Sequence, residues 1–196
     1  MNSIARSGSA WALAALLLAA LGGCQTARVA QPLTAELAGN EPSQQLEFWH
    51  TLATRPLTSN DEAFHGLLLY TDGQDPADSY DARVELLKSR KMLPANFRGQ
   101  ANEAVQRGTL AVAICRALEI KGGVMMRLSG AAPRYAVREL QFAELYPPSS
   151  TFQTFSGGEF VGIIGRMEDY QRGQAVKVPA AVLPPEIRST DSPAPQ

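Results

Sequence analysis

The sequence predicts a mainly α-helical domain in which three helix–loop–helix repeats pack as a pseudo-threefold helical bundle. Two segments, residues 107–120 (RGTLAVAICRALEI) and 157–170 (GGEFVGIIGRMEDY), carry apolar residues at matching positions, and Arg116 matches Arg166. The apolar residues follow the spacing of one face of a helix. One helix–loop–helix unit cannot bury its apolar face alone, so we expect several units to share a core.

Each of these two segments follows another predicted helix. Residues 81–92 place Val84 and Leu87 on one side, and residues 133–145 begin on a proline and stop before the pair Pro147-Pro148. Proline is favoured at the first helical position and cannot continue a helix beyond its end. Each unit is therefore predicted as a helix, a Pro-containing loop and a second helix that ends at glycine.

A weaker first copy precedes these two units. Residues 44–53 form its first predicted helix, and Ser59 with Glu62 repeats the S-x-x-E pattern of Ser156 with Glu159. In this capping box, the hydroxyl and the carboxylate each accept a hydrogen bond from a backbone N–H at the start of the helix. The pattern predicts a second helix that begins after Ser59.

The N-terminal residues resemble a bacterial lipoprotein signal. Arg6 is the only charged residue before Cys24, and the apolar run at residues 10–20 is shorter than the roughly 20 residues that span a bilayer. Residues 21–24 (LGGC) are similar to a lipobox, which implies cleavage before Cys24 and diacylglycerol on its sulfur. An ordinary signal peptide with an incidental cysteine is the alternative. In lipoprotein sorting, Gln25 in place of Asp favours the outer membrane, facing the periplasm.

Composition then divides the chain. We expect a signal peptide at 1–23, a flexible tether at 24–43, the helical domain at 44–173 and a Pro-rich tail at 174–196. Without Arg6, 17 of the 18 basic residues remain against 19 acidic residues. The mature chain is therefore slightly acidic and has no visible basic patch, which argues against nucleic acid as a partner.

The middle repeat resembles the S-layer homology (SLH) family at residues 105–110 (VQRGTL) and 115–120 (CRALEI). The resemblance covers residues 44–173 as three copies. It implies a pseudo-threefold helical prism that binds cell-wall polysaccharide in grooves between repeats. It also implies that a motif arginine at the start of the second helix grips the acidic glycan.

The sequence departs from the family at its ligand positions. Gln106 and Thr109 stand where the family has Thr and Glu, Gly157 replaces the arginine of the third copy, and the comparable position of the first copy lies near Asn60. Arg107 alone retains the motif arginine. It is a candidate anion ligand, since a helix N-terminus favours negative charge; an ordinary surface arginine is the alternative.

Other chemistry is sparse. The chain has no H-E-x-x-H, no paired cysteines and no G-x-S-x-G, so we expect no zinc site, no nucleophile elbow and no cofactor. Cys115 is predicted to be a buried core thiol and His65 a structural histidine. Oxygen-rich loops can bind calcium, but the loop acids are equally typical of turns and caps; these acids are Asp72, Asp75, Asp78 and Asp81.

These observations favour a non-catalytic, lipid-anchored envelope protein that contacts peptidoglycan or another wall polymer. The alternative is a protein-interaction lipoprotein, an accessory subunit of an envelope assembly. An enzyme is disfavoured because no nucleophile, base and orienting group can be assigned. Beside Pro147-Pro148, Tyr146 and Phe152 are candidates for an exposed aromatic ligand site.

Overall fold

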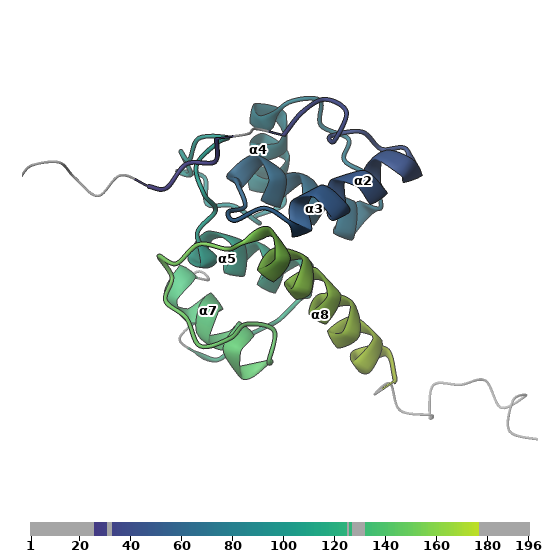
Figure 1. Ribbon diagram of the computed structural model, residues 1–196. Helices are drawn as coiled ribbons and strands as arrows, with labels where there is room; N and C mark the ends of the chain where they lie inside the picture. The colour runs from purple at the N-terminus through teal and green to yellow at the C-terminus, as the bar shows by residue number, and fades with distance from the viewer. Residues whose placement is uncertain (1–25, 31–32, 125, 127–131, 177–196) are drawn as a thin grey trace, which may run out of the picture.

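The computed structural model describes residues 26–30, 33–124, 126 and 132–176, which form a mainly α-helical structure (Figure 1). Cys24, the predicted signal peptide and most of the Pro-rich tail lie outside these residues. Six α-helices lie within the described part: α2 (Pro42–Ala53), α3 (Asn60–Asp72), α4 (Tyr80–Ser89), α5 (Arg107–Ala117), α7 (Pro133–Phe142) and α8 (Gly157–Val176). Each occupies a segment where the sequence predicts a helix, so the mainly helical prediction is confirmed.

Searching the described helices for a membrane span identifies none with the length and apolarity to cross a bilayer.

The predicted capping boxes are confirmed at the starts of α3 and α8. The Glu62 carboxylate accepts a hydrogen bond from Ser59 N at 2.8 Å, and Ser59 Oγ accepts one from Glu62 N at 3.2 Å. The same exchange joins Ser156 and Glu159 at 2.9 and 3.2 Å. Because these bonds satisfy backbone N–H groups that have no partner inside the helix, they fix where each helix begins.

The helices pack in three pairs: α2 against α8, α3 against α4, and α5 against α7. In every pair, the first helix of one predicted unit packs against the second helix of a different unit. Aromatic and aliphatic residues from the helices fill one continuous core, including Phe48, Phe64, Leu110, Leu140 and Phe160. The predicted units therefore share their apolar faces rather than burying them separately.

Extended segments before α3, α5 and α8 meet at the centre of this arrangement. Val105 N donates to Thr58 O at 2.9 Å, and Thr58 N donates to Phe155 O at 2.9 Å. Arg107 N donates to Gln153 O at 2.7 Å. Thr58, Val105 and Phe155 are fully buried, so these bonds satisfy backbone groups that water cannot reach.

The N-terminal segment differs from the flexible tether that its composition predicts. Ala104 N donates to Ala27 O at 2.8 Å, and Val29 N donates to Asn102 O at 2.8 Å. Residues 26–30 therefore lie along the segment before α5 as a short antiparallel partner. The polar composition of the segment does not reveal this pairing, because only backbone groups form it.

The rest of the predicted tether also contacts the domain. Leu33 and Leu37 pack against the core. The Asn40 side chain donates to Asp75 O at 2.8 Å and accepts from Asp75 N at 2.7 Å. For the described residues before α2, the flexible-tether prediction is therefore wrong: two leucines and one amide fix the segment to the domain.

A close approach of backbones fixes how α8 begins. Gly157 N donates to Arg55 O at 2.9 Å, and a Cβ built at Gly157 would lie 1.6 Å from Leu52 O. No side chain fits there without moving the end of α2 away from the start of α8. In contrast, a Cβ at Gly162, one turn further along α8, meets nothing within 4 Å.

These two glycines give a matched test of the packing of α2 against α8. Gly157→Ala is expected to lower the free energy of unfolding by about 3 kcal/mol, because the methyl group forces the two backbones apart. Gly162→Ala is expected to raise it by about 0.5–1 kcal/mol, the usual gain from removing a helix-interior glycine. Urea unfolding followed by circular dichroism measures both. Equal effects of the two substitutions would contradict the close approach.

Candidate functional site

Arg107, predicted from the SLH resemblance as the motif arginine, is buried and paired inside the protein. Its Nη2 lies 2.7 Å from Glu159 Oε1, and its Nε donates to Thr154 O at 3.1 Å. The guanidinium carbon lies 4.6 Å from the centre of the Phe155 ring. Only 6% of Arg107 is exposed, so the surface-arginine alternative is wrong. The guanidinium joins the start of α5 to the start of α8, and its burial limits its contact with an external anion.

Glu159 is held ionised by this environment. The Ser156 backbone N–H lowers the pKa of Glu159 below its usual value, and the Arg107 guanidinium lowers that pKa further. One carboxylate thus serves as both helix cap and ion-pair partner. The sequence predicts the cap from its local spacing but not the pair, because Arg107 and Glu159 meet only in the folded chain.

The two other positions comparable to Arg107 are also committed to packing. The Asn60 side-chain amide donates to Gln100 O at 2.9 Å. At Gly157 the backbone of α2 excludes any side chain. The absence of a motif arginine at Gly157 therefore has a steric reason.

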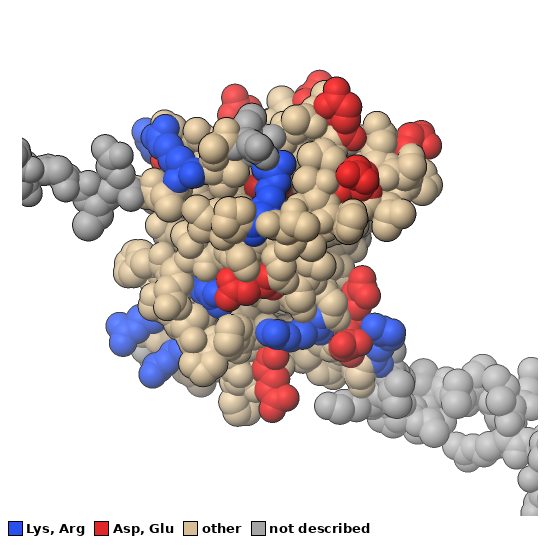
Figure 2. Space-filling view, in the orientation of Figure 1, with Lys and Arg blue, Asp and Glu red and all other residues tan. Residues whose placement is uncertain are grey.

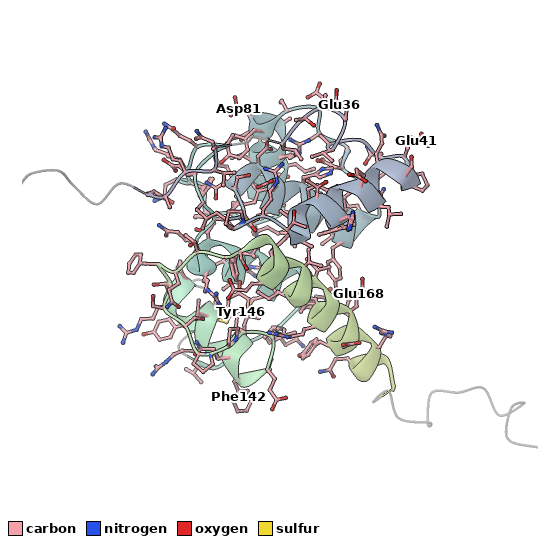
Figure 3. The ribbon with its side chains drawn as sticks, in the orientation of Figure 1. Glu36, Glu41, Asp81, Phe142, Tyr146 and Glu168 are labelled. Carbon is pink, nitrogen blue, oxygen red and sulfur yellow. The ribbon has the colours of Figure 1, made fainter. Side chains whose placement is uncertain are left out.

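The predicted aromatic site divides between a buried and an exposed residue. Tyr146 is only 3% exposed, and its hydroxyl donates to Arg107 O at 3.4 Å. Its prediction as an exposed aromatic is wrong, because the turn after α7 carries its ring against Phe155, at 5.6 Å between ring centres (Figure 3). Phe152 is 80% exposed, as predicted. Phe142, which the sequence does not single out, is 89% exposed.

An open hollow between α2, α3 and α8, called here the aromatic groove, has a volume of about 490 Å³. Half-buried Trp49 and Tyr70 line it, together with Gln45, Glu168 and Gln171. Trp49 stacks on Phe160 with 6.3 Å between ring centres, and Tyr70 Oη donates to Gln171 Oε1 at 2.6 Å. The groove offers aromatic surface, an acid and amide groups on a well-packed support, a combination suited to a polar ligand with apolar faces.

A second hollow, called here the N-terminal groove, lies where the starts of α3 and α5 approach each other. Its volume is about 340 Å³, and its lining includes Thr26, Asn60, Arg98, Gln106 and Thr109. This groove contains the positions at which the middle repeat departs from the family motif. Unlike the aromatic groove, it lies beside the docked N-terminal segment.

His65 belongs to a buried charged cluster that joins α3 to α4. Its Nδ1 lies 2.6 Å from Asp75 Oδ2, and Arg83 Nε donates to the same oxygen. Arg83 Nη1 also donates to Asp61 Oδ1 at 2.8 Å. Burial acts to raise the pKa of Asp75, but the hydrogen bonds from His65 and Arg83 outweigh burial and lower that pKa. Desolvation raises the pKa of Asp61.

This cluster accounts for His65, and arginines pair with two of the four loop acids that are candidate calcium ligands. The side chains of His65 and Asp75 are fully buried, which agrees with the predicted structural role of the histidine. Asp75 is bound to Arg83, and Asp72 pairs with Arg90 at 2.7 Å. Across the described residues, no group of three or more acids, histidines or cysteines could hold a metal ion.

Cys115 is buried as predicted, with 1% of its surface exposed. Desolvation raises the pKa of its thiol to about 12. The thiol is therefore inert toward reagents that need a thiolate.

Comparison with known proteins identifies no relative: no protein-family model, curated protein or solved structure matches this chain. The functional argument therefore depends on the geometry of the chain itself.

The buried cluster predicts a specific pH dependence of stability. Asp75→Asn is expected to lower the free energy of unfolding by about 3 kcal/mol at pH 7, because it removes the buried carboxylate that pairs with both Arg83 and His65 and leaves Arg83 with Asp61 as its charged partner. The ionised Asp75 stabilises the fold fully above its unfolded pKa of about 3.8, and this contribution is lost as the pH falls through its lower folded pKa. The deficit of the variant should therefore be constant between pH 7 and 5 and shrink below pH 4.

Urea unfolding at a series of pH values measures this deficit, and Asp78→Asn, on the exposed loop, is the control expected to have little effect. A deficit that stayed constant down to pH 3 would mean that ionised Asp75 does not carry the stabilisation.

Proposed function

We propose that this protein is a non-catalytic, lipid-anchored cell-envelope protein whose SLH-like domain contacts peptidoglycan or another cell-wall polymer. The anchor is the lipid predicted on Cys24, and the membrane is the outer membrane, with the domain in the periplasm. The domain consists of three helix–loop–helix units arranged with pseudo-threefold symmetry: α2 with α3, α4 with α5, and α7 with α8.

The cyclic order of contacts between units is the observation that carries the proposal. The first helix of each unit packs on the second helix of another unit, in the pairs α2 with α8, α4 with α3, and α7 with α5. Backbone hydrogen bonds also link the units, from Val105 N to Thr58 O and from Thr58 N to Phe155 O. These three residues hold the equivalent place, one residue before the N-cap, in their units. In these head-to-tail contacts, the front helix of one unit meets the back helix of the next. A closed ring of three similar units requires contacts of this kind.

The aromatic groove is the best supported contact site for a glycan. It lies between the first and third units, and a sugar ring presents C–H faces that stack on Trp49 or Tyr70. Sugar hydroxyls can pair with the amides of Gln45 and Gln171 and with the carboxylate of Glu168. Arg107 has a different role in this proposal: it stabilises the junction between units and does not grip the ligand.

Sedimentation with purified wall sacculi tests the proposal. The mature chain with Cys24→Ala is expected to sediment with sacculi, and Tyr70→Phe combined with Gln171→Ala is expected to weaken binding by about tenfold or more. Each lost hydrogen bond contributes about 1 kcal/mol, or roughly a factor of five. Gln174→Ala, which changes an exposed residue of α8 outside the groove, is the matched control. A chain that stays in the supernatant would contradict wall binding.

An accessory lipoprotein that binds another envelope protein is the second candidate. Phe142 and Phe152 support it, because they expose 89% and 80% of their surface on the third unit. Exposed aromatic residues are enriched at protein interfaces.

A photo-crosslinking residue in place of Phe152 distinguishes this candidate in cells. One dominant protein adduct, reduced at least fivefold when the crosslinker instead replaces exposed Gln174, is the expected result for an accessory subunit. Equal, diffuse crosslinking at the two positions would contradict it.

A further inference from the structure

The N-terminal segment leaves almost no free chain between the domain and its predicted lipid. Ala27 and Val29 are hydrogen-bonded to the segment before α5, and Arg28 forms an antiparallel bridge with Glu103. Thr26 lines the N-terminal groove. The folded part of the chain therefore begins at or before residue 27.

Only two peptide units separate Thr26 from Cys24, and they span at most about 7 Å. A lipid-modified cysteine places its acyl chains in the bilayer and its backbone at the headgroup level. The surface around Thr26 must then lie within about 10 Å of the headgroups. A chain this short cannot act as a long spacer, so it also limits how the domain can rotate.

We propose that the face around Thr26, Arg28 and Arg98 rests on the phospholipid headgroups of the membrane that holds the lipid on Cys24. This inference depends on the lipidation in the proposed function and adds the orientation of the domain. The phospholipid headgroups then contact the N-terminal groove, and the wall polymer contacts a different side of the molecule.

Charge on this face suits anionic phospholipid. Arg98 is exposed, and the Arg28 side chain is 56% exposed and lies 3.8 Å from Glu103. Basic side chains near an anionic leaflet are attracted to its headgroups. Basic side chains lie along the edge at which the N-terminal segment leaves, whereas acidic side chains line the upper right edge (Figure 2). Glu36, Glu41 and Glu168 lie away from the edge where the N-terminal segment leaves (Figure 3).

This orientation directs the aromatic groove away from the bilayer. Glu168 lines that groove and lies on the side of the molecule opposite the N-terminal segment (Figure 3). The lipid and the groove can therefore engage the membrane and the wall at the same time.

Fluorescence quenching on vesicles tests the orientation. The full lipoprotein is placed in vesicles of phosphatidylethanolamine and phosphatidylglycerol (3:1) that contain a lipid with a spin-labelled headgroup. A thiol-reactive fluorophore is attached to Asn96→Cys, beside the N-terminal groove, or to Glu36→Cys as the control. Buried Cys115 does not react, because its thiol has a pKa raised to about 12.

Quenching at position 96 is expected to exceed quenching at position 36 at least threefold. A ten-residue Gly-Ser insertion between Gln25 and Thr26 should bring the two values within twofold, because the domain then tumbles freely. Equal quenching without the insertion, or a ratio unaffected by it, overturns the proposal.

Vesicle flotation separates this outcome from failure of the anchor. If the wild-type lipoprotein does not float with vesicles, lipidation on Cys24 is wrong, and the orientation is overturned with it. If it floats, Cys24→Ala does not, and the two quenching values are equal, the anchor stands and only the orientation is overturned.

Discussion

Mutual hydrogen bonding of the extended segments before α3, α5 and α8 is the constraint on which the other contacts depend. These segments cross between the helices, where unpaired backbone groups would each cost a few kcal/mol. Thr58 shows how these groups are paired: its N–H donates to Phe155 O, and its carbonyl accepts from Val105 N. Asn60 N donates to Glu103 O at 2.8 Å in the same way. No segment can move without breaking bonds to its neighbours, so the positions of all three helix starts are coupled.

Arginine–glutamate pairs reinforce the same centre. Glu62 caps α3 and lies 2.8 Å from Arg55 Nη1, and Glu159 caps α8 and lies 2.7 Å from Arg107. The buried pair of Arg55 with Glu62 adds little net stability because both charges lose hydration, and the pair of Arg107 with Glu159 adds little because Glu159 stays half-exposed to water. Their geometric effect is larger: each carboxylate must satisfy a helix N-terminus and an arginine together, which selects one register between segments. The start of α5 has Thr109 where the others have glutamate, and no side chain caps it.

Local features were predictable from the sequence, and features that depend on distant contacts were not. Ser59 and Ser156 mark helix starts because capping depends on residues only three positions apart. The positions of the helices followed from apolar spacing and from prolines. By contrast, Tyr146 is buried by the turn that follows α7. The pair between Arg107 and Glu159 joins two helices far apart in the chain, and Ala27 is held by backbone groups alone. The aromatic groove combines Trp49 and Tyr70 from different helices with α8, and no local pattern indicates such a juxtaposition.

The three places where helices of different predicted units meet differ in how far side chains fill them. At the starts of α5 and α8, Arg107, Tyr146 and Phe155 fill the junction and leave it closed. At the starts of α3 and α5 a polar groove remains, beside the docked N-terminal segment. Between α2, α3 and α8 the aromatic groove remains open. Because the backbone bonds at the centre do not depend on side chains, each junction can change its lining while the fold persists. Arg107 lies in the closed junction, where it packs against Glu159 and Phe155, so the proposed function assigns the ligand to a junction that keeps an opening.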